Sequence, residues 1–181
     1  PGEVWLALSG NQRIAAASNG DNDSIRLFDC AAGHMRLRGF IPKPSEARVT
    51  AISVDATGDR VAIGTSEGEL WVIDLQTPEA RLFSQPDDFD GAIHALKFAS
   101  NDSWVLAGGR GPAVIVYDLT TADQIERFPC SAWVLGLDTY DQTRALVAAT
   151  SDGNVTVWSS DSGNILDDVE QWQAPTTPNG P

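Results

Sequence analysis

The stretch RVTAISVDATGDRVAIGTSEGELWVID, residues 48–74, has the pattern of three short β-strands joined by two tight turns. Its apolar runs are Val49–Val54, Val61–Gly64 and Leu70–Ile73. Ala-Thr-Gly-Asp lies after the first run and Ser-Glu-Gly after the second, and tight turns favour these residue types. The stretch therefore predicts a small antiparallel sheet whose third strand ends at Asp74.

The same pattern occurs in three other parts of the chain, residues 5–29, 93–118 and 134–159. The residue that closes the third strand is Asp29, Asp74, Asp118 or Ser159, so the units follow at intervals of 45, 44 and 41 residues. Four-stranded propeller blades repeat every 40 to 45 residues or so. The sequence therefore predicts an all-β fold, a β-propeller of four-stranded antiparallel blades, with four blades present.

Small residues recur near the end of each middle strand. They are Ala17-Ser18, Gly64-Thr65, Gly108-Gly109 and Ala149-Thr150. Because small side chains let another sheet come close, we expect a neighbouring blade to approach the middle strand at these positions.

A fourth, outer strand is expected after each closing residue, at 34–40, 81–83, 124–128 and 164–169. The blades are then predicted at 1–40, 41–83, 84–128 and 129–171. Residues 172–181 contain three prolines and no periodic pattern, so they are predicted to be a linker or a disordered tail.

The units resemble the blades of WD-repeat β-propellers, in degenerate form. The family has an aromatic-Asp pair at the end of the third strand, where this chain has Phe28-Asp29, Ile73-Asp74, Tyr117-Asp118 and Trp158-Ser159. Thr150, Asp152 and Trp158 match three members of the family's hydrogen-bond network. Ser45, Phe89 and Cys130 stand where its His would be. The resemblance implies structural roles for Asp29, Asp74, Asp118, Thr150, Asp152 and Trp158.

The charge of the chain bears on its partners. It has 12 Lys and Arg against 25 Asp and Glu, a net charge of −13. A protein this acidic repels a phosphate backbone, so direct nucleic-acid binding is disfavoured and a partner with a basic surface is expected. The alternative is that the acidic residues only keep the surface soluble.

The cysteines and the hydropathy pattern bear on location. Cys30 and Cys130 lie in different units without metal-ligand spacing, which favours reduced thiols. No apolar run reaches 18 residues. We expect an intracellular protein, cytoplasmic or nuclear, that is not in a membrane.

The resemblance also implies where partners dock. In the family, the loops between blades and the hairpins after the middle strands line a rim at which partners commonly bind. By position, the rim residues here are Lys43, Arg48, Asp87, Asp88, Phe89, Asp90, Arg110, Trp133 and Asp152. The acidic stretch 87–90, with one aromatic residue, is a candidate hook for a basic ligand. It is also compatible with an ordinary solvated loop.

The search for catalytic motifs finds little. His34 and His94 lie in different units, and no nucleophile elbow or phosphate-binding loop is present. The inner strands offer Thr50, Ser53, His94, Lys97 and Asp138. These are too few acids and histidines for a metal or cofactor site, so no metal, no cofactor and no catalysis are expected.

The expected function depends on whether four blades can close a propeller ring. Family propellers have about seven blades, and four blades packed for a wider ring leave two open apolar faces. We therefore expect further blades, from the same or another chain, and a non-catalytic scaffold that mediates protein-protein interactions within a larger assembly. The alternatives are a quinoprotein-like or lactonase-like propeller enzyme and the sensor propeller of a longer signalling protein.

Overall fold

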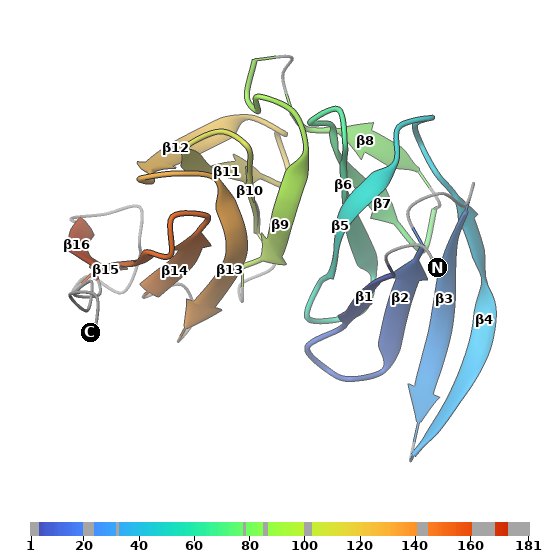
Figure 1. The fold of residues 1–181 in the computed structure, drawn as a ribbon. Helices are drawn as coiled ribbons and strands as arrows, with labels where there is room; N and C mark the ends of the chain where they lie inside the picture. Colours follow the sequence, from blue (N-terminus) through green and yellow to red (C-terminus); the bar gives the residue numbers. More distant parts are fainter. Residues whose placement is uncertain are drawn as a thin grey trace, which may run out of the picture.

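The computed structural model describes residues 4–19, 24–31, 33–77, 79–84, 87–99, 103–140, 145–160 and 169–173. These residues form four four-stranded antiparallel sheets, in which the strands are paired in the order of the chain. The sheets are arranged like the blades of a fan, with β1, β5, β9 and β13 innermost (Figure 1). No helix occurs in these ranges, and so none there could cross a bilayer. The predicted all-β fold with four-stranded blades is confirmed.

Each sheet is built from one continuous part of the chain. Sheet 1 contains β1 (Trp5–Leu8), β2 (Ile14–Ser18), β3 (Ser24–Ala31) and β4 (His34–Pro42). Sheet 2 contains β5 (Val49–Val54), β6 (Arg60–Thr65), β7 (Leu70–Asp74) and β8 (Ala80–Leu82). Sheet 3 contains β9 (Ile93–Phe98), β10 (Trp104–Gly109), β11 (Ala113–Asp118) and β12 (Gln124–Pro129). Sheet 4 contains β13 (Val134–Tyr140), β14 (Ala145–Thr150), β15 (Val155–Ser160) and β16 (Val169–Gln173).

The outer strands differ most from the sequence-based expectation. β4 runs on to Pro42, two residues beyond the expected end of the first blade. β16 covers Val169–Gln173, so the first two residues of the expected tail belong to a strand. Of the outer strand expected at 164–169, residues 164–168 lie outside the described residues. Within β16, Trp172 pairs with Val157. The sequence of this strand has no clear alternation of apolar and polar residues, so its position could not be predicted from the sequence. In the structure the strand is defined by its backbone pairing with β15.

The strand pairing corrects the alignment of the first repeat by one residue. Ile14 pairs with the closing residue Asp29, as Arg60 pairs with Asp74. Counting along the middle strand then puts Ser18, and not Ala17, at the position of Gly64. The connection from the middle strand to the third strand is one residue longer in sheet 1 than in sheet 2. An alignment counted back from the closing aspartates is therefore wrong by one residue at the middle strand.

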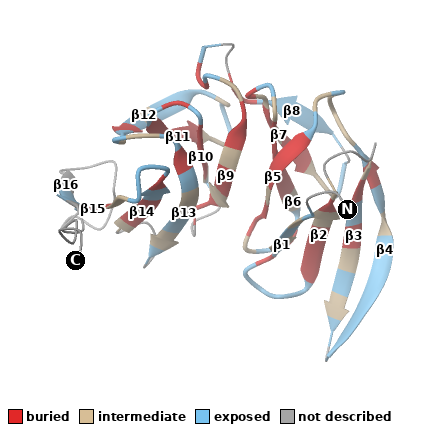
Figure 2. Ribbon diagram, viewed as in Figure 1, coloured by how far each residue is buried: buried red, intermediate tan, exposed pale blue. Residues whose placement is uncertain are grey.

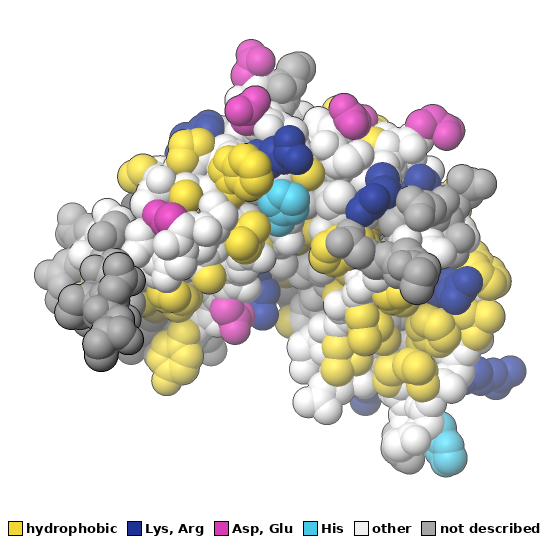
Figure 3. All heavy atoms as spheres, viewed as in Figure 1, with side chains coloured by type: hydrophobic (Ala, Val, Ile, Leu, Met, Phe, Trp, Pro, Cys, Tyr) yellow, Lys and Arg dark blue, Asp and Glu magenta, His cyan; other side chains and the backbone are white. Residues whose placement is uncertain are grey.

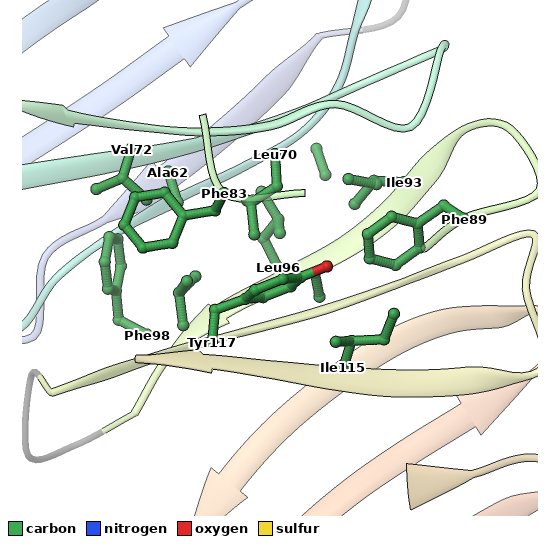
Figure 4. Close-up of a cluster of buried hydrophobic side chains, with 13 residues drawn as sticks. Ala62, Leu70, Val72, Phe83, Phe89, Ile93, Leu96, Phe98, Ile115 and Tyr117 are labelled. Carbon is green, nitrogen blue, oxygen red and sulfur yellow. The ribbon is translucent and has the colours of Figure 1, made fainter. Parts of the chain in front are cut away.

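The sheets are held together by three clusters of apolar side chains, one between each pair of neighbours. Between sheets 2 and 3, Leu70, Val72 and Phe83 pack against Ile115 and Tyr117 (Figure 4). The rings of Phe83 and Tyr117 meet edge to face, with centroids 6.5 Å apart. Burial of apolar area on this scale is the main stabilising contribution in any domain.

Glycine allows the close approach that the small residues predicted. A Cβ atom at Gly64 would lie 2.6 Å from Cγ2 of Ile93, the first residue of the next sheet's inner strand. A Cβ atom at Gly108 would lie 2.5 Å from Cγ1 of Val134, again at the start of the next inner strand. The expectation holds for both positions.

A buried aspartate organises the turn between β5 and β6. Oδ1 of Asp55 accepts hydrogen bonds from the backbone N–H groups of Gly58, Asp59 and Arg60 at 2.8, 2.8 and 3.2 Å. Its Oδ2 accepts one from Nε of Arg60 at 3.0 Å. The Arg60 guanidinium also lies 5.9 Å from the ring centroid of Phe98 in sheet 3. Asp55 was missed in the sequence because the turn residues beside it already accounted for the turn.

Candidate interaction surfaces

The loops at one end of the inner strands form a surface from two repeating positions. The N–H of Ser66 donates to the carbonyl of Arg48, that of Arg110 to Ala92, and that of Ser151 to Trp133, at 2.8, 3.1 and 2.8 Å. The same bond thus joins the residue before an inner strand to the residue after a middle strand in sheets 2, 3 and 4. Because only backbone atoms make the bond, the side chains at both positions are free to differ from blade to blade.

The structure brings some of the predicted rim residues together. The guanidinium carbon of Arg110 lies 5.2 Å from the ring centroid of Trp133, in cation–π contact. Arg48 is exposed, and so are Asp87, Asp90 and Asp152. The ammonium group of Lys43 donates to the carbonyl of Ala47 at 3.3 Å, within its own loop.

Two of the predicted rim residues face the interior, which corrects the idea of an acidic hook around an aromatic ring. Phe89 is only 6% exposed and belongs to the cluster between sheets 2 and 3. Asp88 is also buried, and its Oδ2 accepts a 2.6 Å hydrogen bond from the hydroxyl of Tyr117. Burial and this neighbouring carboxylate raise the pKa of Tyr117 far above its usual value. These two residues therefore anchor the loop and leave only Asp87 and Asp90 at the surface.

In sheet 4, two members of the predicted network, Thr150 and Asp152, are joined by a hydrogen bond. The Thr150 hydroxyl donates to Asp152 Oδ1 at 2.6 Å, and the Asn154 side-chain amide donates to Oδ2 at 2.8 Å. Ser131, the residue after Cys130, lies beside Thr150, with 3.4 Å between the two hydroxyl oxygens. The hydrogen bonds from Thr150 and Ser131 lower the pKa of Asp152 to about 2. Trp158 is buried against Phe128, with ring centroids 5.5 Å apart.

The closing aspartates have two different roles. Asp74 Oδ1 accepts from the N–H groups of Gln76 and Thr77, and Asp118 Oδ1 accepts from those of Thr120 and Thr121. The bonds from Thr121 and Thr120 hold the pKa of Asp118 below its ordinary value. Asp29 instead lies 3.9 Å from Arg38 in an exposed ion pair. The first two therefore fix turns, whereas the contact described for Asp29 is an ion pair at the surface.

The polar residues of the inner strands bind one another. Nζ of Lys97 lies 2.7 Å from Asp138 Oδ1, which joins sheets 3 and 4. Burial raises the pKa of Asp138, but the bonds from Lys97 and from the N–H of Thr139 outweigh it and leave the pKa below its ordinary value. The Thr50 hydroxyl donates to the carbonyl of Ile93 at 2.6 Å. Among the described residues, no group of three or more His, Cys, Asp or Glu side chains is placed to hold a metal ion.

Comparisons with known proteins agree with this geometry, although no family model matches the chain. The Periodic tryptophan protein 2 homolog of Schizosaccharomyces pombe is 26% identical over 133 residues, 71% of this chain and 15% of that protein. The F-box-like/WD repeat-containing protein TBL1X of Mus musculus is 27% identical over 129 residues, 70% of this chain and 23% of that protein. The crystal structure of RRP9 WD40 repeats has a TM-score of 0.75 at 19% identity, and it covers 93% of this chain and 49% of that one.

The four sheets have the fold of WD40 propeller blades. This confirms the resemblance inferred from the repeat pattern. The chain spans less than a quarter of the length of these two relatives and about half of the RRP9 structure.

The first blade leaves one apolar face uncovered. Residues paired across its strands share this face: Leu6 with Ala17, Leu8 with Ala15, Phe28 with Leu37, and Arg26 with Phe40. Leu6 is 69% exposed and Phe40 is 60% exposed. The outer strand β4 is pale blue over much of its length in Figure 2. Ile14, Ile25 and Leu27, on the opposite face, are buried against sheet 2.

The fourth blade leaves its opposite face open. The register places Tyr140 and Ala145 on one face with Val147, Val157 and Trp172. Tyr140 is 73% exposed and Trp172 is 57% exposed. Leu146 and Trp158 on the other face pack against sheet 3. The two open faces therefore lie at the two ends of the fan, and each faces away from the blades that are present.

Proposed function

We propose that this chain is a non-catalytic WD-repeat scaffold within a larger protein assembly. In this proposal its loops contact protein partners, and further four-stranded blades from the same or another chain cover its two end faces. The observation that carries the proposal is the pair of open apolar faces, on which Leu6, Phe40, Tyr140 and Trp172 are each more than half exposed. Such large contiguous apolar patches on a soluble protein mark interaction sites.

The geometry supports further blades as the occupants of these faces. Each end face is a β-sheet surface with the same orientation as an interior face that packs on the next sheet. The chain also superimposes on half of the RRP9 WD40 structure. A sheet that continues the fan would bury both rows of side chains as sheets 2 and 3 bury theirs, at about 25 cal/mol for each Å² of apolar area.

The absence of catalysis is proposed from the polar groups that the described residues contain. A hollow of about 700 Å³ lies between the turns of sheets 1 and 2. Two of its charged groups, Asp29 and Arg38, are paired with each other. The inner strands use Lys97, Asp138 and Thr50 in blade-to-blade contacts. None of these arrangements pairs a nucleophile with a base.

Partners and location follow from the charge and the thiols. We propose a partner with a basic surface, since Asp87, Asp90 and Asp152 are exposed on a chain of net charge −13. Direct binding of a nucleic-acid backbone is disfavoured for the same reason. Cys30 and Cys130 are both free thiols, which fits an intracellular location, cytoplasmic or nuclear.

The scaffold proposal is tested by the association state of the 181-residue chain. Native mass spectrometry and light scattering are expected to show concentration-dependent association. Replacing Leu37 and Phe40 together by Lys should reduce it, because both side chains lie on the first end face. Leu82→Lys is the matched control, since Leu82 is a similarly exposed residue on the outer strand of an interior blade. A chain that stays monomeric at all concentrations and melts cooperatively would overturn the proposal.

A further inference from the structure

The two open faces correspond to the two sides of one interior interface. Inside the fan, each sheet packs the side that faces later sheets against the side of the next sheet that faces earlier ones. Sheet 1 leaves open the side that faces earlier sheets, the first end face, and sheet 4 leaves open the side that faces later ones, the second end face. The first end face can therefore pack on the second with the geometry that the chain already uses three times.

The second end face repeats a row of side chains that sheet 3 buries. Val147 and Val157 pair across the two central strands of sheet 4, as Leu106 and Val116 pair at the same positions of sheet 3. Leu106 and Val116 are fully buried, whereas Val147 and Val157 are only half-buried. The second end face thus carries apolar residues where an interior sheet packs on its neighbour.

The first end face lacks a neighbour for an aromatic ring at a fixed position of the repeat. Phe28, Tyr117 and Trp158 each directly precede the closing residue of a third strand. The ring of Tyr117 meets that of Phe83 from sheet 2, with centroids 6.5 Å apart. The ring of Trp158 meets that of Phe128 from the outer strand of sheet 3, with centroids 5.5 Å apart. Phe28 is only half-buried, because the described residues place no sheet before sheet 1.

The other member of such an aromatic pair is present at the far end of the fan. Trp172 lies on the outer strand β16, on the second end face, and is 57% exposed. A second copy placed head to tail would set Trp172 of one copy against Phe28 of the other. The exposed Leu37 and Phe40 on the outer strand of the first end face would be covered at the same time. Figure 3 shows hydrophobic side chains gathered over sheet 1.

The part of a ring that the four sheets leave open has the size of one further copy. The alignment with the RRP9 WD40 structure covers 93% of this chain and 49% of that one. Two copies give eight blades, within the range of about four to eight that propellers have. Because the contact is head to tail, a two-fold rotation covers both end faces of both copies, and association then stops at two.

We propose that the end faces bind a second copy of this chain, first end face to second end face, and that two copies close an eight-bladed ring. The inference rests on the proposed scaffold function, because it names the blades that cover the end faces. It also makes a narrower claim than that function, since a closed ring has a fixed number of copies.

The number of copies is the first test. Native mass spectrometry and sedimentation velocity of the 181-residue chain should show monomer and dimer alone, with the dimer fraction rising with concentration. Longer species should be absent, because the closed dimer has no free end face.

The second test blocks one end face at a time. Leu37→Lys with Phe40→Lys blocks the first end face, and Tyr140→Lys with Trp172→Lys blocks the second. Each double variant alone should raise the dissociation constant of the dimer at least about a hundredfold, because unpaired ammonium groups would enter every apolar interface. Leu82→Lys, on the outer strand of an interior blade, is the matched control and should leave the dimer unchanged.

Mixing the two blocked variants should restore association. The intact second end face of one variant can then bind the intact first end face of the other, and native mass spectrometry should show a dimer that contains one copy of each. This dimer has one intact interface in place of two, so it should be weaker than the dimer of the unmodified chain. Circular dichroism checks that each variant is folded.

The aromatic pair is tested by a double-mutant cycle. Phe28→Ala and Trp172→Ala should each weaken the dimer, and their combined effect should fall short of the product of the two by about fivefold or more. Leu6→Ala combined with Trp172→Ala is the control, because Leu6 lies on the inner strand and Trp172 on the outer strand. The effects of this control pair should multiply.

The possible failures are separable. A dimer that either blocked variant still forms alone would overturn the head-to-tail contact, because identical faces would then be pairing. A ladder of trimers and longer species would overturn the closed ring. Both results would leave the scaffold proposal standing, since the end faces would still be covered by blades. A chain that stays monomeric at all concentrations would overturn both proposals.

Discussion

Gly108 in sheet 3 and Ala149 in sheet 4 occupy the same place in their blades, since they pair with Val114 and Val155 at matching points of the third strand. At Gly108 a Cβ atom would lie 2.5 Å from Val134 of the next blade, whereas Ala149 is exposed. The requirement for glycine therefore comes from the next sheet and not from the strand itself. The same position is restrictive inside the fan and permissive at its end.

The interior of the fan is expected to be most sensitive at Asp55. Asp55→Ala removes the acceptor for three backbone N–H groups and leaves Arg60 without its carboxylate partner. Breaking a buried ion pair on one side costs about 3 kcal/mol or more of unfolding free energy. Urea denaturation followed by tryptophan fluorescence measures this loss.

The control for Asp55 is Asp138, which pairs with Lys97 at the surface. Asp138→Ala breaks a largely exposed pair with Lys97 and should cost less than about 1 kcal/mol. Equal losses for the two variants would show that burial does not set the importance of these carboxylates.

The difference between Gly108 and Ala149 can be tested directly by placing valine at each position. Gly108→Val forces a side chain into Val134, and overpacking of this kind costs about 2 kcal/mol. Ala149→Val adds two methyl groups to an open face, and its effect should stay within about 0.5 kcal/mol. Thermal unfolding of the two variants side by side gives the answer. Similar melting temperatures would mean that the interface between sheets 3 and 4 accommodates the added side chain, which would contradict the prediction.

Tyr117→Phe tests the hydrogen bond between Tyr117 and Asp88 in the interior of the fan. The substitution keeps the ring in the cluster but leaves the buried Asp88 carboxylate without its 2.6 Å hydrogen bond. Losing a hydrogen bond to a buried carboxylate costs about 1–2 kcal/mol. Chemical denaturation measures the loss, and Tyr140→Phe at the open end is the matched control with no expected effect. A neutral Tyr117→Phe variant would contradict the anchoring role of Asp88.

The smallest effect concerns the pH dependence of the exposed network in sheet 4. Asp152 has a pKa of about 2 in the folded chain against an ordinary 3.8, because Thr150 and then Ser131 stabilise its charged form. Its contribution to stability is therefore fully present above about pH 4 and is lost as the pH falls through about 2. NMR titration of the carboxyl carbon should show the low midpoint, and Thr150→Val should move it toward 3.8. A midpoint near 3.8 in the unmodified chain would contradict the network.

Local patterns in the sequence were enough to predict the blades and their number, because each strand is an apolar run bounded by turn residues. They also predicted the small residues Gly64 and Gly108 that the packing needs. They failed where the determining partner is far away or a length changes. From the sequence, Asp88 and Phe89 were expected in an exposed acidic loop. In the structure Asp88 is buried and bonded to Tyr117, 29 residues away, and the sequence pattern gives no sign of this contact. Ser18 takes the place of Gly64 only because one hairpin is longer.

Every sheet is a single uninterrupted segment of the chain, and no strand crosses from one sheet to another. The backbone ladder of a blade can therefore be completed as soon as its own four strands have left the ribosome. Its apolar face must wait for the strands that are translated next. Nascent sheets 1, 2 and 3 would then each expose an apolar surface for the time needed to synthesise about 40 more residues, which is a few seconds. In this interval a chaperone could bind the exposed face.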